Sequence, residues 1–225
     1  MNVRHMLTIA GLTLVTLAPA FVAAEGPSRE AGWDFGADIV YQLSGDAKFD
    51  GGTQLDFDDD VGLALNFGYR FTPRIELQFG IDWNTVNYHG VLQSASIPGI
   101  TANVHGDWES FTPHINGVFN LMDGPLTPYI AGGIGWSFID TNIPTGQVSI
   151  GCWWDPWWGQ ICTPYQATLS TDQLTYQAAL GVRWDFGEES SLKFGWEKTW
   201  FDMEHASSTP SWDQVKLGFV YRMSY

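Results

Sequence analysis

The feature that most constrains this chain is an alternation of large apolar residues with small or polar residues, repeated in eight segments of about ten residues. Side chains of a β-strand point alternately to its two faces, so each segment predicts a strand with one apolar and one polar face. The segments are 33–43, 61–71, 75–84, 111–121, 129–139, 174–186, 192–200 and 215–225. After residue 24, no window approaches the roughly 18 uninterrupted apolar residues that a transmembrane helix needs. The chain is therefore expected to be all-β.

The two faces of the predicted strands differ in a way that favours a membrane barrel. The apolar faces carry bulky aromatic residues near the strand ends, such as Trp33, Tyr69 and Trp184. The opposite faces carry small residues with charges of both signs, which suits the interior of a narrow closed barrel. A soluble barrel or sandwich, with the apolar faces in its core, is the alternative. Aromatic residues that flank an apolar outer band are typical of strands that face lipid.

Short and long connections alternate between the predicted strands. Turns at 72–74, 123–125 and 187–189 separate long links at about 44–57, 87–107, 141–172 and 202–212. Both ends of the strand array lie on the short-turn side, which requires an even number of strands. The sequence therefore predicts an eight-stranded antiparallel up-and-down transmembrane β-barrel with four long extracellular loops, the organisation of an outer-membrane barrel.

The first residues predict an export signal. A basic start at Arg4 and His5 precedes an apolar run from 6 to 18, and small residues at 22–24 precede Glu25. The run is too short for a membrane span, and no stop-transfer pattern follows it. We expect residues 1–24 to form a cleaved signal peptide and residues 25–225 to form the barrel domain; a buried amino-terminal helix is the alternative.

Charge and cysteine content restrict the partners and the compartment. The chain has 25 acidic residues against 10 Lys and Arg, a formal net charge of -15, whereas nucleic-acid binding needs a basic footprint. Nucleic acid is therefore not expected as a partner. Cys152 and Cys162 lie downstream of the export signal and are expected to face an oxidising compartment, where they can form a disulfide.

The final segment, VKLGFVYRMSY, places apolar side chains at every second position and ends on an aromatic residue. It resembles the assembly signal of Gram-negative outer-membrane barrels, with Phe219, Tyr221 and Tyr225 as the expected residues. The stretches LNFGYRFTPRIEL, PYIAGGIGWSF and YQAALGVRWDF resemble the opacity-protein and outer-membrane-protein-A-like family of eight-stranded barrels, a porin family. The resemblance implies a place in the Gram-negative cell outer membrane, insertion by the barrel-assembly machinery, and contact with outer-membrane lipid and lipopolysaccharide.

The same resemblance implies no single activity, because such barrels host adhesins, anchors, narrow channels and lipid-modifying enzymes. Some relatives append a peptidoglycan-binding periplasmic domain. The sequence ends with the last predicted strand, so we expect no such domain and no wall-anchoring role through it.

The inward faces gather ionisable residues that are expected to form a charge network in the lumen. Isolated charges in a narrow, low-dielectric interior are unfavourable, so near-balanced signs predict ion pairs and hydrogen bonds. The expected members are Asp34, Arg70, Glu76, Arg183, Lys193, Glu197, Lys216 and Arg222. Eight strands leave an interior that side chains can just fill, which favours a structural plug. A gated path for small ions or apolar solutes is the alternative.

The link 141–172 contains CWWDPWWGQIC, in which Cys152 and Cys162 enclose four indoles: Trp153, Trp154, Trp157 and Trp158. A disulfide would restrict the unfolded ensemble of this segment by about 2–3 kcal/mol. Indoles on a rigid, exposed tip are suited to recognition, because they supply contact area at low entropic cost. Two interpretations stay open: the indoles bind a surface glycan or protein ligand, or they pack as a lid over the barrel mouth.

Two weaker signals concern metal binding and catalysis. The acidic run 56–60 offers carboxylate oxygens to a divalent cation but lacks the ligand spacing of a calcium loop, so a solvated acidic surface is favoured. His205 and Ser207 resemble the His-x-Ser pair of outer-membrane lipid A deacylases, but Ser208 stands where that family usually has Asn. The expected inward parity of the pair also points away from lipid substrate. We therefore expect no enzyme, no metal and no cofactor.

The leading functional hypothesis is an integral outer-membrane barrel with a structural or adhesin-like surface-interaction role, exerted through acidic, Trp-rich extracellular loops. A narrow channel is the second hypothesis, and a lipid A-modifying enzyme is the third.

Overall fold

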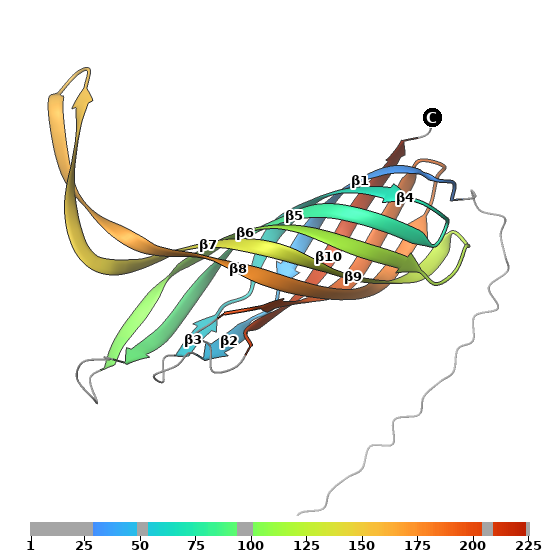
Figure 1. The fold of residues 1–225 in the computed structure, drawn as a ribbon, viewed down its shortest axis with the longest axis horizontal. Coiled ribbons are helices and arrows are strands. Elements are labelled where there is room, and N and C mark those ends of the chain that lie inside the picture. The colour runs from blue at the N-terminus through green and yellow to red at the C-terminus, as the bar shows by residue number, and fades with distance from the viewer. Residues whose placement is uncertain (1–28, 49–53, 94–100, 204–208, 224–225) are drawn as a thin grey trace, which may run out of the picture.

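The computed structural model describes residues 29–48, 54–93, 101–203 and 209–223. Within these residues, no helix is long and apolar enough to span a membrane. Ten strands form one antiparallel sheet (Figure 1). They are β1 (Gly32–Gln42), β2 (Gly45–Lys48), β3 (Gln54–Phe57), β4 (Asp60–Arg70), β5 (Ile75–Gln93), β6 (Thr101–Asn120), β7 (Leu126–Asp155), β8 (Gly159–Asp185), β9 (Ser190–Phe201) and β10 (Ser211–Met223).

Eight of these strands close into a barrel in chain order, β1, β4, β5, β6, β7, β8, β9 and β10. The last strand returns to the first, so that Ala37 of β1 lies opposite Phe219 of β10. Closure gives each of the eight strands two hydrogen-bonding neighbours, which is required where lipid offers no partner to the backbone. The predicted eight-stranded antiparallel barrel is thus confirmed.

The alternation read from the sequence separates an apolar outer face from a polar interior. On β4, Leu63 and Leu65 point outward and are each 64% exposed, whereas Arg70 points inward and is fully buried. This is the reverse of a soluble barrel, whose large apolar side chains fill the interior. The 11 residues of β1 extend about 36 Å, and a tilt of about 45° gives a height of about 25 Å, which matches the apolar band of outer-membrane barrels.

Two of the predicted long loops are instead largely strands. Residues 87–93 and 101–107 continue the ladder between β5 and β6, which runs from Ile75 opposite Phe119 to Gln93 opposite Thr101. Residues 141–172 form the outer part of the β7–β8 hairpin, which projects far beyond the barrel and bends (Figure 1). Continued pairing satisfies the backbone groups of these segments without a protein core, which explains why they are not irregular.

The described residues of the predicted link 44–57 also form strands. Residues 45–48 and 54–57 pair as the short hairpin β2–β3, in which Ala47 lies opposite Leu55. The hairpin attaches to the outer part of β5, where Phe57 pairs with Tyr88. Its apolar side chains Ala47, Leu55 and Phe57 are buried in one cluster with Tyr88 of β5.

Candidate functional site

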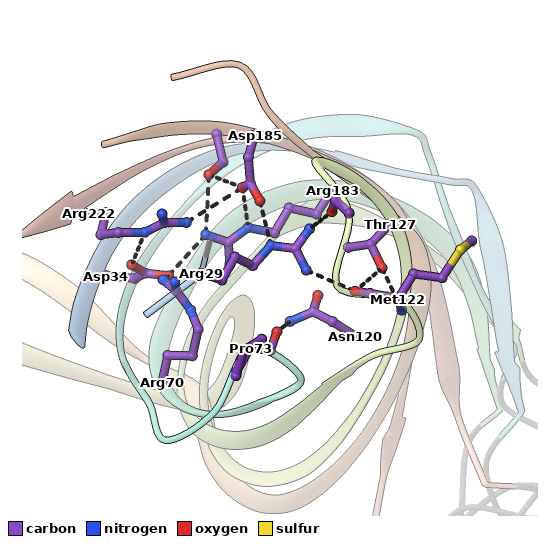
Figure 2. A network of polar contacts seen from close by, with 12 residues as sticks. Arg29, Asp34, Arg70, Pro73, Asn120, Met122, Thr127, Arg183, Asp185 and Arg222 are labelled. Atoms are coloured by element: carbon purple, nitrogen blue, oxygen red, sulfur yellow. Dashed lines mark hydrogen bonds and ion pairs between the residues drawn. The ribbon is translucent and has the colours of Figure 1, made fainter. Parts of the chain in front are cut away.

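Arg183 is the centre of a charge layer at the short-turn end of the lumen (Figure 2). Its guanidinium lies 3.1 Å from Glu76 Oε2, 3.1 Å from Asp34 Oδ2 and 3.0 Å from Asp185 Oδ1, and its side chain is fully buried. Arg70 forms a second ion pair with Asp34. Because four strands supply these side chains, the network ties opposite walls of the barrel together.

Arg29 completes this layer from outside the strand array. It precedes β1, is buried, and forms an ion pair with Asp185. It also donates hydrogen bonds to the carbonyl oxygens of Met122, at 3.1 Å, and Gly124, in the turn between β6 and β7 (Figure 2). Arg29 was not among the predicted lumen residues, because it belongs to no alternating segment.

Arg222 lies at the edge of the same layer. Its guanidinium is 3.9 Å from Asp34 Oδ1 and 3.8 Å from Asp185 Oδ1, and it donates to the Glu188 carbonyl oxygen at 3.0 Å. We call the whole group the basal charge layer: Arg29, Asp34, Arg70, Glu76, Arg183, Asp185 and Arg222. Buried charges that are paired and hydrogen-bonded in this way form a plug, and removing one partner leaves the others uncompensated.

A middle polar layer lies above the basal charge layer. Lys216 Nζ is 2.8 Å from Asp82 Oδ2 and 2.7 Å from Glu197 Oε1, and His114 Nδ1 is 3.9 Å from Asp82 Oδ2. Lys193 Nζ connects the two layers through Glu76, at 3.8 Å. The adjoining cavity measures about 40 Å³, which is room for one or two water molecules rather than a solute.

An aromatic cap fills the barrel mouth at the opposite end. Its members are Phe57, Tyr88, Trp108, Phe201 and Trp212, all of them buried. Ring centroids are 4.7 Å apart for Phe201 and Trp212, 5.3 Å for Phe57 and Trp108, and 5.9 Å for Trp108 and Trp212. A void of only about 10 Å³ remains beside these rings, so the cap is tightly packed.

The three layers together fill the lumen from end to end. The eight residues that the sequence analysis assigned to a lumen network all point inward, in the basal and middle layers. The aromatic cap was not foreseen, although strand parity contains the signal: Tyr88 and Trp108 have the inward parity of β5 and β6 once those strands are extended.

Outward-facing aromatic donors mark both edges of the lipid-facing band. Each donates its O–H or N–H to a carboxylate, and three of the four distances are 2.9–3.1 Å. The pairs are Tyr41 with Asp59, Trp83 with Glu109 and Trp136 with Asp172 at the hairpin end, and Tyr221 with Glu189 at the short-turn end. Tyr and Trp prefer this position because their rings are apolar while their donors need polar partners.

The far end of the β7–β8 hairpin carries the second candidate site. The expected disulfide joins Cys152 to Cys162, which lie directly opposite one another in the ladder. Beyond it, Asp155 Oδ1 accepts hydrogen bonds from the backbone N–H groups of Trp157, at 2.8 Å, and Trp158, at 3.0 Å. Gly159 then takes a left-handed conformation with φ of 76°, which favours glycine. The Asp155 side chain and the left-handed Gly159 therefore stabilise this turn.

The four indoles of this hairpin tip, Cys152–Cys162, face solvent. Exposure is 51% for Trp153, 77% for Trp154, 82% for Trp157 and 79% for Trp158. They do not form the lid that one interpretation of the sequence placed over the barrel mouth. That place is taken by the aromatic cap, whose residues come from five other strands.

The structure shows less about the other residues that the sequence singled out. Phe219 and Tyr221 of the expected assembly signal face outward, and Tyr225 lies outside the described residues. His205, Ser207 and Ser208 also lie outside them, as do residues 1–24. Asp58 of the acidic run is 3.8 Å from His89. Among the described residues, no three or more His, Cys, Asp or Glu are grouped to hold a metal ion.

Comparison with known proteins shows which family has this architecture. The model of the outer membrane protein beta-barrel domain matches residues 9–222. No curated protein matches the sequence. Among solved structures, OprG of Pseudomonas aeruginosa is 14% identical with a TM-score of 0.52, over 88% of this chain and 99% of that one. A major outer membrane protein of Thermus thermophilus is 12% identical with a TM-score of 0.52, over 85% and 99%. At these identities, the two likenesses concern the fold alone.

Proposed function

The chain belongs to the outer membrane protein beta-barrel domain family, and from this premise we propose that it is a non-enzymatic surface-interaction protein whose contact element is the β7–β8 hairpin. The observation that carries the proposal is the exposure of Trp154, Trp157 and Trp158, each at least 77% accessible on a disulfide-closed tip. Exposed indoles of this kind contribute strongly to binding interfaces. Among the other aromatic side chains whose burial is described, the most exposed lie on the outer face of the barrel and the rest are partly or fully buried.

The proposal includes the orientation and the route to the membrane. Residues 1–24 direct export and are removed, the barrel-assembly machinery inserts the chain, and the short turns face the periplasm. The lipid-facing band then contacts outer-membrane lipid, and the rim at the hairpin end meets lipopolysaccharide. The hairpin tip extends outward, where a surface glycan, a protein or a lipid surface is available to bind.

The lumen supports the channel alternative poorly. A conducting path would have to pass the aromatic cap, the middle polar layer and the basal charge layer, and the cavity in the middle layer measures about 40 Å³. A path through paired buried charges requires them to separate, which leaves charges uncompensated in a low-dielectric interior. This geometry favours a plug that stabilises the barrel.

A binding screen tests the proposal. The folded barrel in lipid nanodiscs would be presented to panels of glycans, matrix proteins, lipopolysaccharide and phosphatidylcholine vesicles. The matched variant replaces Trp153, Trp154, Trp157 and Trp158 with Ala, and its barrel should stay folded because the four side chains contact no barrel layer. We expect at least one probe to bind the wild type and to lose about tenfold or more in affinity with the variant. Undiminished binding of every probe would refute the proposal.

A further inference from the structure

The indoles of the hairpin tip leave it in more than one direction. Trp153 and Trp154 are consecutive on β7, so their side chains leave opposite faces of the hairpin. Trp157 and Trp158 lie in the turn itself. All four rings keep half or more of their surface exposed, from 51% for Trp153 to 82% for Trp157. The tip therefore offers apolar surface on more than one side of its end.

This arrangement fits a lipid interface better than a sugar or a single protein pocket. Stacking on a sugar needs a flat aromatic face with polar groups beside it that bond the hydroxyls. The carboxylate of Asp155 already accepts two backbone hydrogen bonds within the tip. A bilayer interface surrounds an inserted element on all sides, and indoles prefer that depth because an apolar ring carries one polar N–H.

The charge of the hairpin selects the type of bilayer. From 140 to 172 the chain contains the acidic residues Asp140, Asp155 and Asp172 and no Lys, Arg or His. The whole chain has a formal net charge of -15. Attraction to anionic lipid depends on Lys and Arg near the membrane surface, so this hairpin has no means of binding such a surface through charge. At a zwitterionic surface, no charge repulsion opposes the binding that the apolar rings provide.

The reach of the hairpin separates the tip from the membrane that holds the barrel. Trp136 marks the edge of the lipid-facing band, and Trp154 lies 18 residues further along β7, about 60 Å of strand measured along the chain. The pairing shifts register between Asp140 and Val148, and the hairpin bends on its way to the tip (Figure 1). The outermost ladder is continuous from Val148 opposite Gln166 to Asp155 opposite Gly159, which keeps this end of the hairpin extended (Figure 1). The tip is thus carried well beyond the barrel's own interface.

We infer that the hairpin tip docks into the interfacial region of an apposed zwitterionic bilayer, with Trp154, Trp157 and Trp158 as the inserted side chains. The inference rests on the proposed surface-interaction function and names its ligand class. The inference predicts that the tip binds zwitterionic lipid without contacting a specific headgroup, and that anionic lipid weakens this binding. The disulfide between Cys152 and Cys162 keeps the indoles at the end of the hairpin while it inserts.

Vesicle flotation tests the inference with the full barrel held in nanodiscs. Phosphatidylcholine vesicles should bind the wild type, and Trp154→Ala/Trp157→Ala/Trp158→Ala should bind at least tenfold less. Gln160→Ala, a matched change at an exposed polar residue of the tip, should bind like the wild type. Vesicles that contain phosphatidylserine should bind the wild type more weakly. Equal binding by the triple variant, or tighter binding to the anionic vesicles, would overturn the inference.

Fluorescence quenching locates the tip. Subtracting the emission of the triple variant from that of the wild type isolates the three tip indoles from the chain's other Trp residues, since it has 12 in all. Brominated lipid in the added vesicles should quench this difference signal, whereas brominated lipid in the nanodisc that holds the barrel should not. Quenching from the nanodisc alone would assign the tip to its own membrane and overturn the inference.

Failure of the inference is distinguishable from failure of the proposed function. If phosphatidylcholine vesicles do not bind while a glycan or protein of the screening panel binds in a Trp-dependent way, the lipid inference is wrong and the surface-interaction function stands. If no probe shows Trp-dependent binding, both are wrong.

Discussion

The lumen and the β7–β8 hairpin use the same residue types in opposite ways. In the lumen, Trp108 and Trp212 are buried against each other, and Arg183 contacts three carboxylates. On the hairpin, Trp154 and Trp157 are exposed and the nearest carboxylate, Asp155, bonds only backbone N–H groups of the turn. The charged and aromatic side chains of the lumen pack against one another, whereas the indoles on the hairpin are left to meet an external partner.

This difference indicates how an eight-stranded barrel divides stability and function. Its interior is just wide enough for side chains to fill, so interior polar groups become structural unless they surround a larger cavity. Binding must then be assigned to segments that extend beyond the barrel, and here the longest of them is the β7–β8 hairpin. Variants in the two regions should therefore change different measured quantities.

The largest expected effect is on stability, from the basal charge layer. Arg183→Met removes the partner of Asp34, Glu76 and Asp185, which leaves buried carboxylates with less compensation. We expect the free energy of unfolding, measured by urea titration in phospholipid vesicles, to fall by about 3–5 kcal/mol. Arg74→Met, which breaks an exposed pair, is the control and should have little effect. Similar losses for both would contradict the layer's role.

The aromatic cap should give the next largest effect. Trp212→Ala removes a ring that contacts Phe57, Trp108 and Phe201. The resulting cavity should lower the free energy of unfolding by about 3 kcal/mol. Trp154→Ala is the matched substitution on the hairpin and should change it by less than about 0.5 kcal/mol. The comparison between lumen and hairpin fails if the two substitutions destabilise the barrel equally.

Removing the disulfide should affect the hairpin tip alone. Cys152→Ser/Cys162→Ser loses a crosslink with a constraint of about 2–3 kcal/mol. Amide hydrogen exchange of residues 150–162 should therefore accelerate by about 30- to 150-fold, since local opening carries its own free energy. Exchange of β1 and β10 should not change, and acceleration there would show that the hairpin and the barrel open together.

The smallest expected effect is a pH dependence at the short turns. Arg74 donates to Asp123 at 2.8 Å through two nitrogens, and this pairing lowers the pKa of the Asp123 carboxyl from its usual 3.8. A lowered folded-state pKa means that the stabilisation is present above the unfolded pKa of 3.8 and is lost as the pH falls through the lower folded value. The urea midpoint of Asp123→Asn should therefore differ slightly from wild type at pH 7 and converge with it in strong acid. A difference that grows on acidification would contradict the pairing.

The strand order and the inward or outward direction of each side chain could be predicted, because the alternation shows directly which residues of a strand share a face. Leu63 and Arg70 have opposite parity on one strand, and a single apolar face per strand fixes which of them meets lipid. The strand ends could not be predicted in the same way. Beyond Trp83, β5 leaves the lipid-facing band, so its outer side chains no longer need to be apolar and the pattern that marked the strand fades.

The sites were partly predictable for a related reason. Arg70, Glu76 and Arg183 lie in segments that alternate apolar and polar residues, so the sequence predicts that their side chains point inward. Which of them form ion pairs depends on the register between the strands of the barrel, which the alternation does not give. Arg29 lies before the first strand and has no period to reveal it. The β2–β3 hairpin that supplies Phe57 is only four residues per strand, too short for its alternation to stand out from a loop.

The central claim is that the lumen is closed and that the β7–β8 hairpin carries the function. Single-channel current recording in planar bilayers tests this claim most directly. With the aromatic cap and the basal charge layer in place, the wild-type barrel should insert and show no stable current steps. The same silence is expected after the indoles of the hairpin tip are replaced by Ala. A stable conductance of the wild type that changes in Glu76→Gln or Arg183→Met would contradict the division and assign function to the lumen.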